Sequence, residues 1–414
     1  MREKIEKYKD EAEKEPLAKL FRGGELYCPD YRGRGDVLVV GGIIARIAQK
    51  ISVPKNFLDL QIIEVVGRIL TPGFVDQHVH IIGAGGSAGP VSRTREIKIQ
   101  QIIQAGVTTV VGCLGFDTIT RDLKRLLVKA QALEAQGLTT FIYTGSYTIP
   151  SVTITGSLES DLLLINKVVG IKLAIAEASS THPQEQDLKW IIITARRGAL
   201  LSGKAGILHI HIGDIITEDC PSVWFKMIEK ILHETMIPFT QVVFTHSGRN
   251  SQVFEGALEF AKNGGMVDIT ASHNPDLLPP DVAEERRAKG WRKPSRAILE
   301  MLQAGVPENN ITLSSDSNAS GMLPNGKLRY TNTITLYNEF KDLSQSTGNI
   351  SLALKMVTLN PAKRLGIISH KGTLDEGKDA DILVLTGDLR IQEVYARGRL
   401  MVKDGKPVVK DPFE

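Results

Sequence analysis

Four histidines and an aspartate stand at or just beyond the ends of separate apolar runs: His78, His80, His211, His246 and Asp316. Side chains at positions i and i+2 of a strand point to the same side, so His78 and His80 can reach one ion. Imidazole and carboxylate groups are suitable ligands for Zn²⁺ and similar divalent metals. Any one of these histidines taken alone is more simply explained as a hydrogen-bonded polar residue than as a metal ligand. Five such groups at strand ends favour a shared metal site.

Apolar strand-like runs, separated by helical stretches, predict how these side chains are brought together. The alternation is typical of parallel β/α units, and eight strands close a barrel. The carboxyl ends of all barrel strands meet at one face, where catalytic residues collect. The eight candidate runs are 73–78, 108–112, 140–143, 170–174, 207–211, 242–246, 265–270 and 311–315.

Short strand-like runs separated by glycines occur at both chain ends and predict a second, smaller domain. They are 36–40, 42–47, 380–385, 393–397 and 399–402, a spacing typical of a small β-sandwich. We therefore expect an α/β fold, in which a (β/α)8 barrel over residues 71–370 carries a β-sandwich built from residues 1–70 and 371–414. Helices of the barrel are expected over 119–135, 220–234 and 252–262.

The composition excludes several other classes of protein. The 414 residues are 42% hydrophobic and 23% charged, and 50 basic residues offset 47 acidic ones to leave a net charge of +3. A nucleic-acid-binding protein would need basic residues clustered on one face. Cys28, Cys113 and Cys220 are too far apart to indicate a disulfide framework or a cysteine metal site. The first twenty residues predict a solvated charged helix, and no stretch reaches the ~18 apolar residues of a membrane span. We expect a cytoplasmic protein that binds neither nucleic acid nor membrane.

A series of short motifs runs in constant order from about residue 25 to the C-terminus. They are GFVDQHVH (73–80), GAGGSAGP (83–90), TGSY (144–147), TITG (153–156), VGIK (169–172), HIGD (211–214), THSGRN (245–250), LSSDSN (313–318) and VYARG (394–398). The first resembles the opening signature of the amidohydrolase superfamily, and the whole series resembles its isoaspartyl dipeptidase (β-aspartyl peptidase) family. The resemblance implies a β/α barrel with a β-sandwich made from both termini, which the strand pattern also predicts.

The resemblance further implies two divalent ions, most simply Zn²⁺. One ion would be held by two histidines and the aspartate, and the other by the remaining histidines: His78, His80 and Asp316, then His211 and His246. Lys172 would be carbamylated by CO₂, and the carbamate would bridge both ions, because an unmodified lysine would be repelled by the two cations. The alternative for Lys172 is a barrel lysine paired with a carboxylate.

A mechanism follows from that resemblance. Two ions lower the pKa of a bridging water from 15.7 to roughly 7, and the resulting hydroxide attacks the amide carbonyl. Asp316 would take the proton and pass it to the departing amine. Tyr147 would donate to the developing oxyanion; its alternative role is a half-buried aromatic residue at the barrel rim.

The substrate-binding positions agree with the family only in part. Arg249 and Ser320 stand where the family binds the aspartyl part of the substrate, and an arginine fork suits a carboxylate. Gly85 is a further expected substrate-binding residue. Three positions depart from the family, which commonly has glutamate, threonine and arginine there: Ser87, Phe116 and Ser179. Because the missing glutamate would contact the substrate ammonium, we expect a preference for substrates whose ammonium is absent or masked.

The segment 272–295 is longer than the family loop and is rich in charge. It is either a lid that supplies substrate contacts, with Glu284 or Glu285 replacing the missing glutamate, or a solvated insertion. His273 within it could approach the metals, although a loop histidine is more often simply polar. We interpret His209 as a hydrogen-bonded barrel residue that lies one layer below the metal ligands.

Three functions remain open on the sequence. The first is a two-metal peptidase that cleaves β-aspartyl dipeptides or similar acyl-amino acids. The second is an amidohydrolase acting on a cyclic amide, as dihydroorotases and hydantoinases do, because such enzymes share the metal ligands. The third is a non-catalytic assembly protein. Such a protein would lack some of the expected metal-binding residues, and this sequence has all of them. The expected partner is a small-molecule substrate. The resemblance also implies a homo-oligomer, because members of the family form oligomers.

Overall fold

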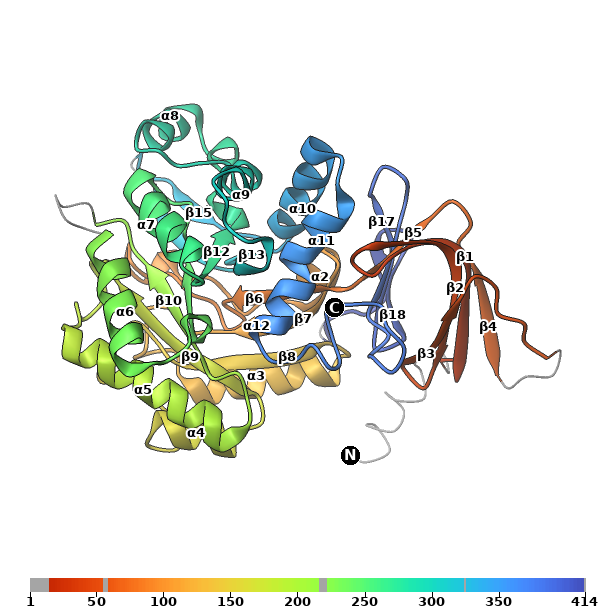
Figure 1. Cartoon of the computed structure of the whole chain (residues 1–414), viewed down its shortest axis with the longest axis horizontal. Coiled ribbons are helices and arrows are strands. Elements are labelled where there is room, and N and C mark those ends of the chain that lie inside the picture. Colours follow the sequence, from red (N-terminus) through yellow and green to blue (C-terminus); the bar gives the residue numbers. More distant parts are fainter. Residues whose placement is uncertain (1–14, 55–58, 216–221, 324, 413–414) are drawn as a thin grey trace.

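The computed structural model describes residues 15–54, 59–215, 222–323 and 325–412, and within them eight parallel strands form one curved sheet (Figure 1). Each strand pairs with the next one along the chain. Val79 bridges to Ser317, and the His80 N–H donates to the Ser317 carbonyl at 3.0 Å, which joins the last strand region to the first. The strands are β6 (Phe74–Val79), β7 (Val107–Gly112), β8 (Thr139–Gly145), β9 (Val168–Ile175), β10 (Ile207–Ile212), β11 (Val242–Thr245), β12 (Met266–Thr270) and β13 (Ile311–Ser314). The predicted barrel runs are confirmed, with short shifts at their ends.

Apart from Thr139 and Phe141 in β8, these strands are buried on both faces, because side chains fill the barrel and helices cover its outside. That burial explains why they read as nearly continuous apolar runs. The helices that follow the strands in the described chain are α2 (Ile99–Ile103), α3 (Leu123–Ala135), α4 (Leu158–Leu164), α5 (Glu185–Ser202), α6 (Ser222–Thr235), α7 (Ser251–Lys262), α8 (Pro280–Ala288), α9 (Pro294–Gln303), α10 (Ile334–Thr347), α11 (Ile350–Val357) and α12 (Leu359–Arg364).

Helix α3 begins later than the sequence predicted. Asp122 caps it by accepting the backbone N–H of Arg125 at 2.9 Å. The backbone N–H groups of Ile119 and Thr120 donate instead to Asp117, so these residues form a turn before the helix. Helix α7 begins one residue before the predicted start, after its own cap Asn250. Cys220, the predicted start of α6, lies outside the described residues.

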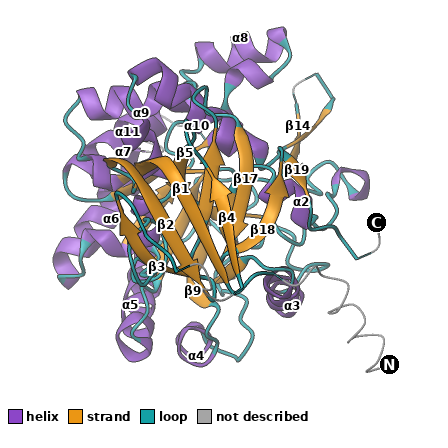
Figure 2. Ribbon diagram, turned by 90° about the vertical axis from the view of Figure 1, so that its right-hand side faces the viewer, coloured by secondary structure: helices purple, strands orange, loops and turns teal. Residues whose placement is uncertain are grey.

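A second sheet, at the right of Figure 1, is made from both ends of the chain. Its nine strands in the described residues are β1 (Ala18–Tyr27), β2 (Tyr31–Val40), β3 (Ile43–Ala48), β4 (Leu60–Glu64), β5 (Ile69–Pro72), β16 (Ile382–Leu385), β17 (Ile391–Ala396), β18 (Arg399–Lys403) and β19 (Lys406–Pro407). The two chain ends join where β16 pairs antiparallel with β5. Figure 2 faces this sheet.

The second sheet folds over on itself around an apolar core. Phe21 of β1 contacts Tyr395 of β17 edge to face, with ring centroids 4.9 Å apart, although β5 and β16 separate these strands in the sheet. Leu70 and Ile382 lie in the same core. This confirms a β-sandwich built from both termini. The exact domain limits, 1–70 with 371–414 and 71–370, stay a prediction.

The prediction of a helix over the first twenty residues is wrong for the last of these residues. Ala18 and Leu20 are buried in β1, which pairs with both β2 and β4, so sheet pairing overrides the helical tendency of this charged stretch. Residues 1–14 lie outside the described residues. No helix in the described part of the chain combines the length and apolar character needed to cross a membrane.

Candidate functional site

The expected metal-binding side chains lie together at the carboxyl ends of the barrel strands. His78 is in β6 and His80 follows it; His211 is in β10, and His246 directly follows β11. Asp316 comes shortly after β13. All five are buried, from 0% exposed for His78 to 7% for Asp316. The barrel face therefore brings together residues far apart in the sequence.

Lys172, His78 and Asp316 form one group of contacts. The Nζ atom of Lys172 lies 3.0 Å from His78 Nε2. Asp316 Oδ1 lies 3.4 Å from that same nitrogen and 3.2 Å from His80 Nε2. Donor atoms of His78, His246 and Asp316 lie within 4.8 Å of one another, and His246 Nε2 lies 2.8 Å from His211 Nδ1. The donor atoms thus converge as ligands of closely spaced ions would.

The second ring nitrogen of each histidine is held by a neighbouring side chain. His78 Nδ1 lies 3.3 Å from the Thr245 hydroxyl, which donates to Asp268 at 2.7 Å. His246 Nδ1 lies 2.8 Å from the Thr270 hydroxyl. His211 Nε2 lies 3.2 Å from Glu177 Oε2, and His80 Nδ1 lies 3.7 Å from Cys113 Sγ. Such outer partners fix the orientation of metal-binding imidazoles, so the donor set fits divalent ions.

Two of these residues have a strained backbone. His246 has φ of 71° and Asp316 has φ of 51°, the left-handed region that side chains rarely adopt. Strain of this kind costs on the order of 1–3 kcal/mol and concentrates at functional sites. The barrel thus holds both side chains in unfavourable backbone conformations at the centre of the site.

The charge states of these groups follow from their burial. Burial lowers the pKa of Lys172 and holds the pKa values of His78 and His246 well below their usual range, and neighbouring cations lower the two histidine values further. Burial also lowers the pKa of His80, but Cys113 and Asp316 outweigh it and raise that pKa to about 10. No carboxylate of the described chain lies within ion-pair distance of Lys172. The alternative of a lysine paired with a carboxylate therefore does not describe this residue.

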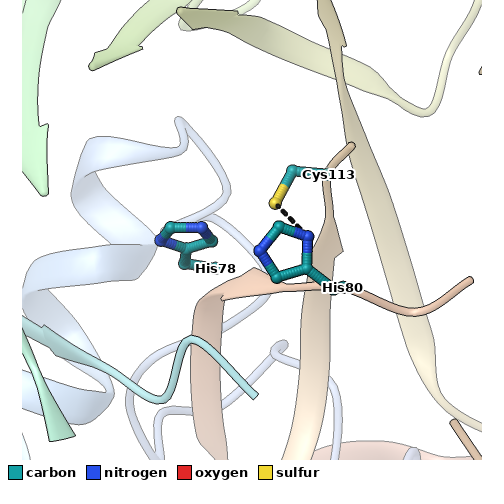
Figure 3. Close-up of side chains that lie close together, drawn as sticks. All are labelled: His78, His80 and Cys113. Atoms are coloured by element: carbon teal, nitrogen blue, oxygen red, sulfur yellow. Dashed lines mark hydrogen bonds between the residues drawn. The ribbon is translucent and has the colours of Figure 1, made fainter. Parts of the chain in front are cut away.

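Cys113 was not expected at the site. It follows β7, and its thiol is close enough to His78 and His80 to form a potential metal-binding trio (Figure 3). The spacing of the cysteines in the sequence could not predict this position, since the trio combines residues at the ends of two neighbouring strands. His209, expected one layer below the ligands, is buried with its Nε2 3.4 Å from His78 Nδ1 and stacks on the ring of Tyr143.

A cavity of about 330 Å³ opens over this cluster. The Tyr147 hydroxyl reaches it, 2.9 Å from His211 Nδ1, and burial together with the Glu177 carboxylate raises the pKa of that hydroxyl well above its usual range. The predicted substrate-binding residues all line the cavity: Gly85, Ser87, Phe116, Ser179, Arg249 and Ser320. Gly85 (φ 77°) packs so closely that a Cβ there would lie 1.9 Å from Ser320 Oγ.

The segment 272–295 reaches the cavity through His273, Arg286 and Trp291. Trp291 contacts both other residues, with the Arg286 guanidinium 4.4 Å from its ring centroid and the tilted His273 ring 5.0 Å away. His273 Nε2 lies 3.9 Å from Asp316 Oδ2, so this loop histidine does approach the cluster. Neither Glu284 nor Glu285 lines the cavity, and Glu285 pairs with Lys289 at 2.6 Å. Their proposed role as a replacement glutamate is therefore wrong.

Other carboxylates and cations of the cavity were not foreseen. Glu177, in the loop after β9, lies 3.6 Å from Arg249. Burial raises its pKa, but His211 and Arg249 outweigh this and lower the pKa to about 2. Asp214 and Arg329 also line the cavity. Glu177 could have been found by its position at the carboxyl end of a strand, whereas Arg329 belongs to a hairpin with no sequence signal.

Comparisons with known proteins show the family to which the chain belongs. Residues 69–401 match the sequence profile of the amidohydrolase family. A β-aspartyl dipeptidase from Fervidobacterium islandicum AW-1, solved with β-Asp-Leu dipeptide, is 33% identical with a TM-score of 0.82, over 96% of this chain and 99% of that one. An imidazolonepropionase from Shewanella sp. (strain MR-4) is 24% identical over 401 residues, 90% of this chain and 92% of the relative. A D-hydantoinase from Thermus sp. shares the fold, with a TM-score of 0.70 and 16% identity over 95% and 97% of the two chains.

Proposed function

Because this chain belongs to the isoaspartyl dipeptidase family of the amidohydrolase superfamily, we propose that it hydrolyses β-aspartyl dipeptides or closely similar acyl-amino acids. The chain is a metal-dependent hydrolase of amide or peptide bonds. The observation that carries the proposal is the convergence of imidazole, carboxylate and lysine atoms on the floor of a cavity lined by Arg249 and Ser320.

The proposed ligands divide between two divalent ions, most simply Zn²⁺. His78, His80 and Asp316 would hold the first ion, and His211 and His246 would hold the second. Lys172, carbamylated by CO₂, would supply a ligand to both. The buried Lys172 amine lies 3.0 Å from His78 Nε2 and has no carboxylate partner among the described residues, which supports a modified lysine, because an isolated buried ammonium is costly. Cys113 keeps an outer position beside His80.

When bound, the two ions would supply Lewis-acid chemistry, lowering the pKa of water to roughly 7 and polarising the amide carbonyl. Asp316 moves the proton: Oδ1 lies within 3.4 Å of the Nε2 atoms of His78 and His80, and Oδ2 lies 3.9 Å from His273 Nε2. Oδ2 accepts the proton of the attacking water and returns it to the departing amine. The Tyr147 hydroxyl stays protonated at neutral pH and donates to the carbonyl oxygen as it gains charge.

Substrate binding rests on the cavity walls. Arg249 and Ser320, with Gly85 behind Ser320, suit a carboxylate on the acyl part. Ser87 and Ser179 offer neutral hydroxyls where the family has charged side chains, and the Phe116 ring adds apolar surface. We therefore propose weak activity on ordinary β-aspartyl dipeptides and better activity where the ammonium is masked. Hydrolysis of a cyclic amide stays the alternative function; a cytoplasmic location and a homo-oligomeric assembly stay predictions.

The test is metal analysis combined with a substrate screen. We expect about two ions per chain and hydrolysis of β-aspartyl dipeptides or N-acyl amino acids that stops on chelation and returns with Zn²⁺. Activity confined to cyclic imides or hydantoins would establish the alternative. A metal-replete protein inactive on all these amides would overturn the proposed function.

A further inference from the structure

The side chain of Arg329 lines the cavity, and its guanidinium has no direct partner among the described residues. Arg329 lies in β15 (Leu328–Tyr330), which forms a hairpin with β14 (Ser320–Met322). Its side chain lines the cavity, and no hydrogen bond or ion pair from the described residues reaches its guanidinium. Burial lowers the pKa of Arg329 to about 10, and Asp316 opposes that effect. A guanidinium carries five N–H donors and stays protonated at neutral pH, so this group is free to bind an anion.

The other two arginines of the cavity each have an acid beside them. Arg249 lies 3.6 Å from Glu177, and Arg286 lies 3.3 Å from Asp214. Among the described residues Arg329 is therefore the cavity arginine without an acid at ion-pair distance. Glu177 and Asp214 are already engaged, so neither is a free partner for a substrate ammonium. The charges of the cavity favour a substrate with carboxylates and disfavour one with an ammonium group.

The position of Arg329 indicates which part of the substrate it contacts. Across the hairpin Arg329 pairs with Gly321, the residue next to Ser320. Ser320 donates to the carbonyl of Ser92 and packs against Gly85, so the whole arrangement belongs to the wall expected to bind the acyl part. Arg286, on another loop, remains for a carboxylate on the amine part. The cavity thus offers separate cations for two carboxylates.

We propose that Arg329 binds a carboxylate on the acyl part of the substrate, and that the preferred substrates are dicarboxylic amides without an ammonium group, of the N-succinyl-amino acid type. The proposal rests on the amide hydrolysis proposed above. N-succinyl-leucine is β-Asp-Leu without its ammonium, so it matches the acyl length of a β-aspartyl dipeptide. Water adds across the amide C–N bond; the acyl carbon gains the hydroxyl, the amine gains the proton, and succinate and leucine leave.

Two substrates that differ in one group test the role of Arg329. N-butyryl-leucine has the acyl length of N-succinyl-leucine but a methyl group in place of the carboxylate. A charge-assisted hydrogen bond typically changes affinity by about tenfold or more. We expect the wild-type enzyme to favour the succinyl amide in kcat/KM by at least about tenfold, and Arg329→Gln to lower this ratio by about tenfold. A ratio measured within one variant does not depend on how much of that variant is folded.

The matched control is Lys327→Gln, which removes one positive charge from the same hairpin. Lys327 is exposed and does not line the cavity, so its ratio should equal that of the wild type. An unchanged ratio in Arg329→Gln, or an equal fall in Lys327→Gln, would overturn the role of Arg329. A kcat/KM for β-Asp-Leu above that for N-succinyl-leucine would overturn the substrate class.

A binding measurement separates this inference from the proposed hydrolysis. Calorimetric titration of the metal-loaded protein with succinate should give a Kd at least about tenfold weaker in Arg329→Gln than in the wild type and in Lys327→Gln. If no amide is cleaved but this difference is found, the proposed function fails and the anion site stands. If amides are cleaved and succinate binds all three proteins equally, the anion site fails and the function stands.

Discussion

Replacing Tyr147 by phenylalanine removes one hydroxyl and leaves the ring in place. That hydroxyl lies 2.9 Å from His211 Nδ1, and the two rings contact each other with centroids 4.8 Å apart. If Nδ1 binds an ion, its lone pair is no longer available, and the hydroxyl proton turns to the substrate carbonyl. Its raised pKa keeps it a donor at neutral pH. The hydroxyl therefore acts on charge that develops only in the transition state.

Loss of one oxyanion donor typically lowers kcat by about 10²–10³-fold. We expect Tyr147→Phe to lower kcat by ~10²-fold with a much smaller change in KM and an unchanged metal content. Steady-state kinetics on the metal-loaded enzyme, with metal counted per chain, measure all three quantities. Tyr143→Phe is the matched control, because the Tyr143 hydroxyl is buried without a hydrogen-bond partner in the described chain. A change in KM alone, or an equal loss in Tyr143→Phe, would refute the oxyanion role.

Four other predictions concern the same cavity. Asp316→Asn should abolish turnover yet retain much of the metal, since its oxygen can still coordinate; activity within tenfold of wild type would remove Asp316 as the proton shuttle. Metal affinity should rise with pH, because the raised pKa of His80 lets a proton compete with the ion up to about pH 10, and a flat affinity between about pH 6 and 8 would contradict this. N-acetyl-β-Asp-Leu should be a better substrate than β-Asp-Leu, and Ser87→Glu should reverse the order; an unmoved ratio would show that position 87 does not contact the ammonium. Gly85→Ala should raise KM severalfold with metal content intact, because its Cβ would displace Ser320; an unchanged KM would count against Ser320 as a substrate contact.

The barrel and the central cluster could be predicted because their signals are local. A strand buried on both faces is a continuous apolar run, and the residue at its carboxyl end is read directly from the chain. His78, His211 and Asp316 were found in this way. Cys113 and Glu177 also lie at or beyond strand ends, and applying the same rule to every polar group would have found them.

The walls of the cavity could not be predicted in the same way. Arg286 reaches the cavity because α8 folds over it, and its guanidinium is held there by Trp291 and Asp214. Arg329 is positioned by the pairing of two short strands. Both placements depend on packing between segments whose own composition does not distinguish a substrate-contacting lid from a solvated loop. The sequence also could not predict that Glu284 lies on the exposed side of α8.

The sheet shared by both chain ends also determines the order in which the protein can fold. Strands β1–β5 leave the ribosome first, but the edge of β5 has no partner until β16 has been synthesised after the whole barrel. Pairings between such distant segments carry a high entropic cost and form slowly. Until then the side chains around Phe21 and Leu70 stay open to water beside an unpaired strand edge, which favours association with other chains. Completion of the β-sandwich is therefore the late step of folding, and a nascent chain that stops before β16 is the form most prone to aggregate.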